Sequence, residues 1–120
     1  MRKHSGKSMT SWSSFSEKNT ALMQRLKSAI HSSVPGASVI LYGSRARGDA
    51  RSDSDWDFMI LTDSPRTPEL EEICRNILYD IELDTDTVIS SIIRSKHEWN
   101  SNRYKNIPLK IRVDEEGMRI

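Results

Sequence analysis

Apolar side chains recur at three- and four-residue steps along the first part of the chain, from Phe15 to Ile30. This spacing is that of one face of an α-helix. Ser14 followed by Glu17 has the spacing of a capping box, which is typical of a helix start. We therefore expect a first amphipathic helix that begins after Ser14 and ends near the helix breakers at 34–36.

Two short apolar runs follow this helix and predict β-strands. The run from Ser38 to Tyr42 is rich in β-branched residues and lies between a Pro-Gly breaker and a Gly-Ser pair. The run from Asp55 to Leu61 begins with alternating acidic and bulky residues and then becomes continuously apolar. A continuous apolar run is typical of a central strand that is covered on both faces, so only the polar start of this strand needs explanation.

A second helix and a third strand complete the pattern. Thr67 can cap a helix with Pro68 at its first position, and an apolar stripe continues from there to Ile81. The stripe includes Cys74, which we interpret as a packing residue. A strand is expected over 87–93, whereas residues 96–120 show no pattern that predicts an element. The order predicts an α/β (α+β) fold with a mixed β-sheet packed by helices.

Composition limits the chain to one intracellular domain. Its 120 residues fit a single domain, which we place at 14–120 after a flexible lead-in at 1–13. The net charge of +1 gives no general attraction to a polyanion, and no apolar stretch reaches the length of a membrane span. A single cysteine excludes an internal disulfide. We expect a cytoplasmic protein without membrane contact, for which nucleic acid could serve only as an acceptor.

The candidate chemistry lies between the first two strands, in the segment GSRARGDARSDSDWD. Asp55 and Asp57 are two residues apart on a predicted strand, so both carboxylates project from one face and can reach one hard cation. Gly43 lets the chain turn with its amides exposed, and Ser44 can open a short helix that attracts phosphate. Two arginines can neutralise phosphate oxygens: Arg47, which we favour because it precedes the flexible Gly48, and Arg45.

Gly43-Ser44, ten residues and then Asp55-Trp56-Asp57 resemble the signature of the polymerase-β-like minimal nucleotidyltransferases, and the flanking apolar strands match as well. By this resemblance Asp55 and Asp57 would bind catalytic Mg²⁺, with two ions possible and Mn²⁺ as a substitute. Gly43 and Ser44 would hold the terminal phosphates of a nucleoside triphosphate, with ATP as the expected donor. An acceptor oxygen would attack the α-phosphate and release pyrophosphate.

The family usually has a third carboxylate on the next strand. Asp86 is the candidate here, because an i, i+2 relation to Val88 and Ser90 would bring it to the active face, although an acidic turn explains it equally well. Two functions therefore stay open. One is transfer of a nucleoside monophosphate to a hydroxyl of a protein, an RNA or a small molecule. The other is a degenerate module that binds only a nucleotide or a partner.

The resemblance also implies a partner. Minimal members of the family often pair with a helical HEPN protein, some as antitoxins that adenylylate the toxin. Independently, apolar residues in the tail of this chain must be covered by some surface, which predicts either self-association or a helical partner. These residues are Ile107, Leu109, Ile111 and Val113.

Overall fold

The structure is a computed structural model that describes residues 9–120; residues 1–8, which hold most of the predicted lead-in, lie outside the described residues. The elements, in chain order, are η1 (Met9–Ser14), α1 (Glu17–Ser33), β1 (Ser38–Tyr42), α2 (Ser44–Arg47), β2 (Trp56–Thr62), α3 (Pro68–Thr85), β3 (Ile89–Ser95), α4 (Lys96–Trp99), α5 (Pro108–Glu116) and β4 (Met118–Arg119). None of the helices over 9–120 is long and apolar enough to cross a membrane.

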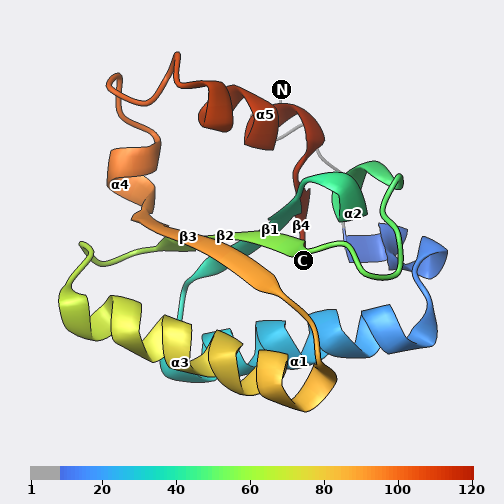
Figure 1. Ribbon diagram of the computed structural model, residues 1–120. Coiled ribbons are helices and arrows are strands. Elements are labelled where there is room, and N and C mark those ends of the chain that lie inside the picture. Colours follow the sequence, from blue (N-terminus) through green and yellow to red (C-terminus); the bar gives the residue numbers. More distant parts are fainter. Residues whose placement is uncertain (1–8) are drawn as a thin grey trace.

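The strands form one mixed sheet in the order β3-β2-β1-β4. β1 runs antiparallel to both β2 and β4, whereas β2 and β3 are parallel. Helices α1 and α3 cover one face of this sheet, and α4 and α5 lie over the other (Figure 1). The predicted mixed sheet packed by helices is confirmed, and the covered faces explain why β1 and β2 are almost continuously apolar.

The helix starts follow from capping side chains. The N-cap of α1 is Ser16, whose hydroxyl accepts a hydrogen bond from the Asn19 amide at 3.1 Å, so the predicted start after Ser14 was two residues early. Ser14 instead ends a 3-10 helix that the lead-in interpretation did not foresee. Thr67 caps α3 as predicted, with Pro68 in the first turn.

The third strand begins later than predicted, at Ile89 instead of residue 87. Helix α3 continues to Thr85, and Asp86 ends it in the left-handed conformation with φ of 53°. A residue in this conformation breaks the alternation of a strand, so residues 86–88 form the turn into β3. The i, i+2 relation that was to place Asp86 on the active face is therefore wrong.

The sheet separates two apolar cores. The larger core lies between the sheet and helices α1 and α3 and includes Cys74 and Trp56, which are 0% and 1% exposed. The smaller core lies under α4 and α5 and includes Tyr42, Trp99 and Val113. The tail thus covers part of its own apolar surface, because Val113 is fully buried there, whereas Ile107 and Ile111 stay exposed.

Candidate active site

The turn after β1 requires glycine at position 43. Gly43 has φ of 79° and ψ of −160°, a region that only glycine occupies without strain. A Cβ atom at this position would collide with Oδ2 of Asp57 and lie 3.2 Å from its Cγ. The backbone therefore approaches the Asp57 side chain as closely as it does because residue 43 has no side chain.

Helix α2 begins directly at this turn. The Gly43 carbonyl accepts hydrogen bonds from the amides of Ala46 and Arg47, both at 3.0 Å, and Gly48 ends the helix with φ of 90°. The amides of Ser44 and Arg45 have no hydrogen-bond partner within the described residues. Free amides that point out of a helix start are suited to bind an anion.

Asp57 lies on the face of the sheet that carries α4 and α5. It pairs in register with Tyr42 of β1 and with Ser90 of β3. The pKa of Asp57 is raised mainly by burial and then by the nearby carboxylate of Asp55. Arg47 and Arg112 lower this pKa. The predicted strand began at Asp55, but β2 begins at Trp56, so Asp55 lies just before the strand and not on it. Its charge still acts on Asp57, and a cation between the two acids would relieve both the repulsion and the desolvation.

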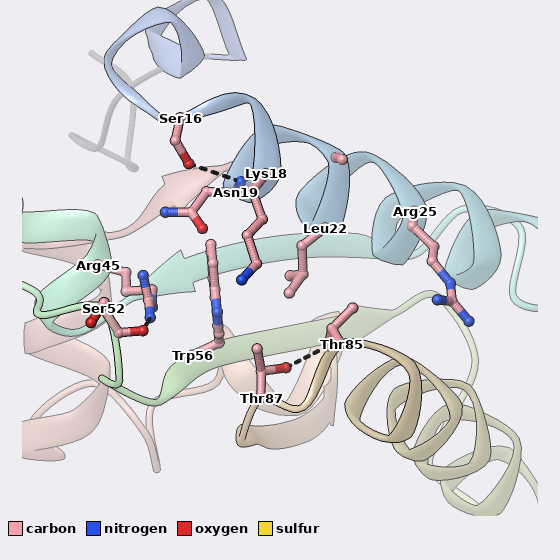
Figure 2. Close-up of a pocket in the computed structure, with 11 residues that line it drawn as sticks. Ser16, Lys18, Asn19, Leu22, Arg25, Arg45, Ser52, Trp56, Thr85 and Thr87 are labelled. Atoms are coloured by element: carbon pink, nitrogen blue, oxygen red, sulfur yellow. Dashed lines mark hydrogen bonds between the residues drawn. The ribbon is translucent and has the colours of Figure 1, made fainter.

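Arg45 lies on the other side of β2. Its guanidinium stacks over the Trp56 ring at 4.4 Å and donates to the carbonyl oxygens of Ser52 and Ser54 at 3.1 and 2.8 Å. Figure 2 shows Arg45, Ser52 and Trp56 together at the edge of a cavity of about 480 Å³, whose lining includes neither Asp55 nor Asp57. The residue is only 8% exposed. Arg45 therefore holds the loop before β2 in place.

Arg47 lies on the side of the two acids and contacts a residue that the sequence did not single out. Its Nη1 atom is 3.2 Å from both carboxylate oxygens of Glu116, at the end of α5. The same carboxylate accepts a hydrogen bond from the Gly43 amide at 2.8 Å. Glu116 also raises the pKa of Asp57, after burial and Asp55. Because it follows Gly43 by more than seventy residues, no local pattern could have revealed it.

Comparison with known proteins identifies this arrangement. The family model for the nucleotidyltransferase domain matches residues 23–119, which is most of the chain. The chain belongs to the nucleotidyltransferase domain family. The polymerase-β-like resemblance is thereby confirmed, and the matched span contains every site residue named above.

A solved structure has the same fold as this nucleotidyltransferase domain. It is a chain from a crystal structure of a toxin-antitoxin with AMP-PNP, with a TM-score of 0.58 and 14% sequence identity. The match covers 80% of the present chain and 69% of that chain. At this identity the likeness concerns the fold alone. No curated protein gave a significant match.

The third carboxylate of the nucleotidyltransferase site is not on β3. Ser90 occupies the position beside Asp57, and Asp86 lies at the exposed end of α3, where it is not among the charges that shift the pKa of Asp57. Within the described residues, no group of three or more His, Cys, Asp or Glu side chains is placed to hold a metal ion. Mg²⁺ usually binds through one or two carboxylates together with substrate phosphates, so Asp55 and Asp57 suit an ion that arrives with a nucleotide.

Proposed function

We propose that this nucleotidyltransferase domain moves a nucleoside monophosphate, AMP from ATP, to a hydroxyl acceptor on a protein, an RNA or a small molecule. The observation that carries the proposal is the packing of Asp57 against the Gly43 turn, where a Cβ atom would collide with the carboxylate. This contact brings the acidic end of β2 next to free backbone amides. An acid pair beside an anion-binding turn is the arrangement that a metal-bound triphosphate requires.

Each residue has a separate role in this proposal. Asp55 and Asp57 would hold Mg²⁺, or Mn²⁺ in its place. A bound ion of this kind would neutralise the negative charge that develops on the phosphates during transfer. Gly43, Ser44 and Arg47 would bind the β- and γ-phosphates. The acceptor hydroxyl oxygen attacks the α-phosphorus, the bond from the α-phosphorus to the bridging oxygen breaks, and pyrophosphate leaves while the hydroxyl proton passes to solvent. Arg45 supports the loop and needs no contact with the nucleotide.

Calorimetric titration of ATP, with and without Mg²⁺, tests the donor site before the acceptor is known. We expect magnesium-dependent binding by the wild type and none by the Asp55→Asn, Asp57→Asn double variant. Asp53→Asn serves as the control, because Asp53 is an exposed acid of the same loop. A folded wild type that binds no ATP in the presence of Mg²⁺ would remove the basis of the proposal. Transfer of label from α-labelled ATP then identifies the acceptor.

A second candidate function is a nucleotide- or partner-binding module without catalysis. Ser90 favours it, because a hydroxyl stands beside Asp57 where the family usually has a third acid. The two candidates differ in turnover. An enzyme releases pyrophosphate from ATP when its acceptor is present, whereas a binding module holds ATP unchanged under the same conditions.

We also infer a protein partner, a helical HEPN-type protein, with this chain as the antitoxin. The structural neighbour from a toxin-antitoxin supports this inference. Tyr79 and Leu83, one turn apart on α3, are 58% and 64% exposed, which is unusual for large apolar side chains. The edge of β3 is less suited to pairing with another chain, because Glu82 and Glu98 accept hydrogen bonds from its first and last amides.

Co-purification with a co-expressed HEPN-type protein tests the surface. The Tyr79→Ser, Leu83→Ser variant is expected to lose the partner while keeping its own fold and its ATP binding. Ile111→Ser is the matched control, because Ile111 is 44% exposed on α5, on the other side of the sheet. Equal retention of the partner by both variants, or its loss in Ile111→Ser alone, would contradict the α3 surface.

A further inference from the structure

The carboxylate of Glu116 contacts the Gly43 amide and the Arg47 guanidinium, which in the proposed function bind the terminal phosphates. One oxygen accepts a hydrogen bond from the Gly43 amide at 2.8 Å, and both lie 3.2 Å from Nη1 of Arg47. A planar anion with two oxygens between a backbone amide and a guanidinium resembles the edge of a phosphate group. The Glu116 carboxylate and a phosphate group cannot occupy this position at the same time.

The side chain of Glu116 can leave without disturbing the backbone that carries it. The end of α5 is held by the Gly117 amide, which donates to the Val113 carbonyl at 2.8 Å. The chain then enters β4, where Met118 pairs with Leu41 of β1. Only side-chain rotation is needed to release the carboxylate, whose side chain is 17% exposed. The contact is therefore a reversible one within a fixed frame.

Charge also favours its departure when a nucleotide binds. In the free protein, Glu116 supplies negative charge to the amide and the guanidinium, and it lies close enough to Asp57 to raise the pKa of that carboxyl. A triphosphate brings its own oxygens to the same two donors, so the amide and guanidinium stay satisfied. The Glu116 carboxylate would then lie next to both the triphosphate and Asp57, and these negative charges repel it.

We propose that Glu116 competes with the terminal phosphates of the nucleotide: it occupies their position in the free protein, leaves when the triphosphate binds, and returns as pyrophosphate departs. This inference rests on the proposed nucleotide site. As a consequence of this competition, triphosphates and pyrophosphate bind more weakly than the Gly43 amide and the Arg47 guanidinium alone would allow. Weaker binding of pyrophosphate promotes its release. AMP, which has no phosphate that reaches Gly43, does not meet this competition.

Glu116→Gln tests the competition, because glutamine keeps the shape and removes the charge. We expect ATP with Mg²⁺, and pyrophosphate, to bind about tenfold more tightly to this variant, the factor that one charge-assisted hydrogen bond represents. The affinity for AMP should not change. Glu115→Gln is the matched control, since Glu115 is an exposed neighbour whose side chain makes no hydrogen bond or ion pair within the described chain. It removes the same charge and should leave all three affinities unchanged.

A measurement on the wild type is independent of any variant's stability. In an amide NMR spectrum the Gly43 signal should move on addition of pyrophosphate and not on addition of AMP, because only pyrophosphate replaces the Glu116 carboxylate. Glu116→Ala should show the same gain in ATP affinity as the glutamine variant.

The possible outcomes distinguish a failed competition by Glu116 from the absence of a nucleotide site. Unchanged ATP affinity in Glu116→Gln, with a wild type that binds ATP, would overturn the competition alone. Weaker binding would also overturn it and would assign Glu116 as a ligand of the metal or the nucleotide. A gain for AMP or in Glu115→Gln equal to that for ATP would reduce the effect to general electrostatics. Failure of the wild type and of both Glu116 variants to bind ATP would refute the nucleotide site itself.

Discussion

The contact between Gly43 and Asp57 gives the sharpest test of how the site is built. Alanine at position 43 introduces two separate costs. The first is backbone strain, because φ of 79° with ψ of −160° is a glycine region, which costs about 1–3 kcal/mol for other residues. The second is steric, because the new Cβ would collide with Oδ2 of Asp57 and force the carboxylate away. We expect Gly43→Ala to lower the free energy of unfolding by about 3 kcal/mol or more.

Gly48→Ala is the matched control for this prediction. Gly48 also has a positive φ, of 90°, but a Cβ atom there would meet no atom within 4 Å. Its cost is therefore strain alone, about 1–2 kcal/mol. Urea denaturation measures both values. Because the clash displaces Asp57, Mg²⁺-dependent ATP binding should fall about tenfold or more in Gly43→Ala and stay near the wild-type value in Gly48→Ala.

A double-mutant cycle isolates the steric part. In an Asp57→Ala background the colliding oxygen and Cγ are absent, and the nearest remaining atom of residue 57 is Cβ, at an ordinary 3.4 Å. Gly43→Ala should then cost only its strain, so the two substitutions are expected to be non-additive by about 1 kcal/mol or more. Additive costs, or equal costs for the alanines at 43 and 48, would refute the idea that this turn is shaped by the Asp57 carboxylate.

Three further predictions concern the surroundings of the site. Asp57→Asn should stabilise the metal-free protein at neutral pH. Burial raises the pKa of Asp57, so the folded state binds the proton more tightly than the unfolded state. Wild-type stability therefore falls as the pH rises from the unfolded pKa to the raised folded pKa of this carboxyl. Thermal melts between about pH 4 and pH 8 should show this fall in the wild type and a smaller one in the variant. Arg45→Ala should lower stability by about 2–3 kcal/mol in urea, since it removes charge-assisted bonds to Ser52 and Ser54 and the stacking on Trp56, and a neutral result would contradict its role in holding the loop. Ser90→Asp places an acid beside Asp57 and should tighten Mn²⁺ binding about tenfold by calorimetry, whereas weaker binding would argue against a metal at this end of β2.

Local signals in the sequence were sufficient for the parts of the fold that they control. Thr67 and Pro68 carry a helix start in their own chemistry, and that start is where the sequence placed it. The apolar runs of β1 and β2 are readable because both faces of these strands are buried. The family could be predicted from the spacing of Gly43-Ser44 and Asp55-Asp57, because this spacing is set locally by the connection between the neighbouring antiparallel strands β1 and β2.

The errors arose where tertiary contacts decide. Ser14 and Ser16 are both chemically able to cap a helix, but Ser14 is the last residue of a 3-10 helix, so Ser16, which follows that helix, caps α1. Helix α5 has only Val113 and Lys110 buried among its nine residues, so it shows no clear apolar stripe, and contact with the sheet stabilises it. The third-strand boundary moved because Asp86 adopts a left-handed conformation that few non-glycine residues take.

The different roles of the two arginines illustrate why linear proximity to a motif does not define a binding residue. Arg45 and Arg47 are two residues apart on a helix, which turns by about 100° per residue, so their side chains leave α2 in nearly opposite directions. One guanidinium reaches the Trp56 side of the sheet and is buried, and the other reaches the Asp57 side and remains exposed. Asp55 directly precedes β2, and Asp57 is the second residue of that strand. They are also two residues apart, yet the charge of Asp55 raises the pKa of Asp57, so these two carboxylates lie near one another. The same two-residue interval therefore separates two cations on α2 and leaves two acids close together at the start of β2, so the local backbone conformation decides which of these side chains can meet a nucleotide.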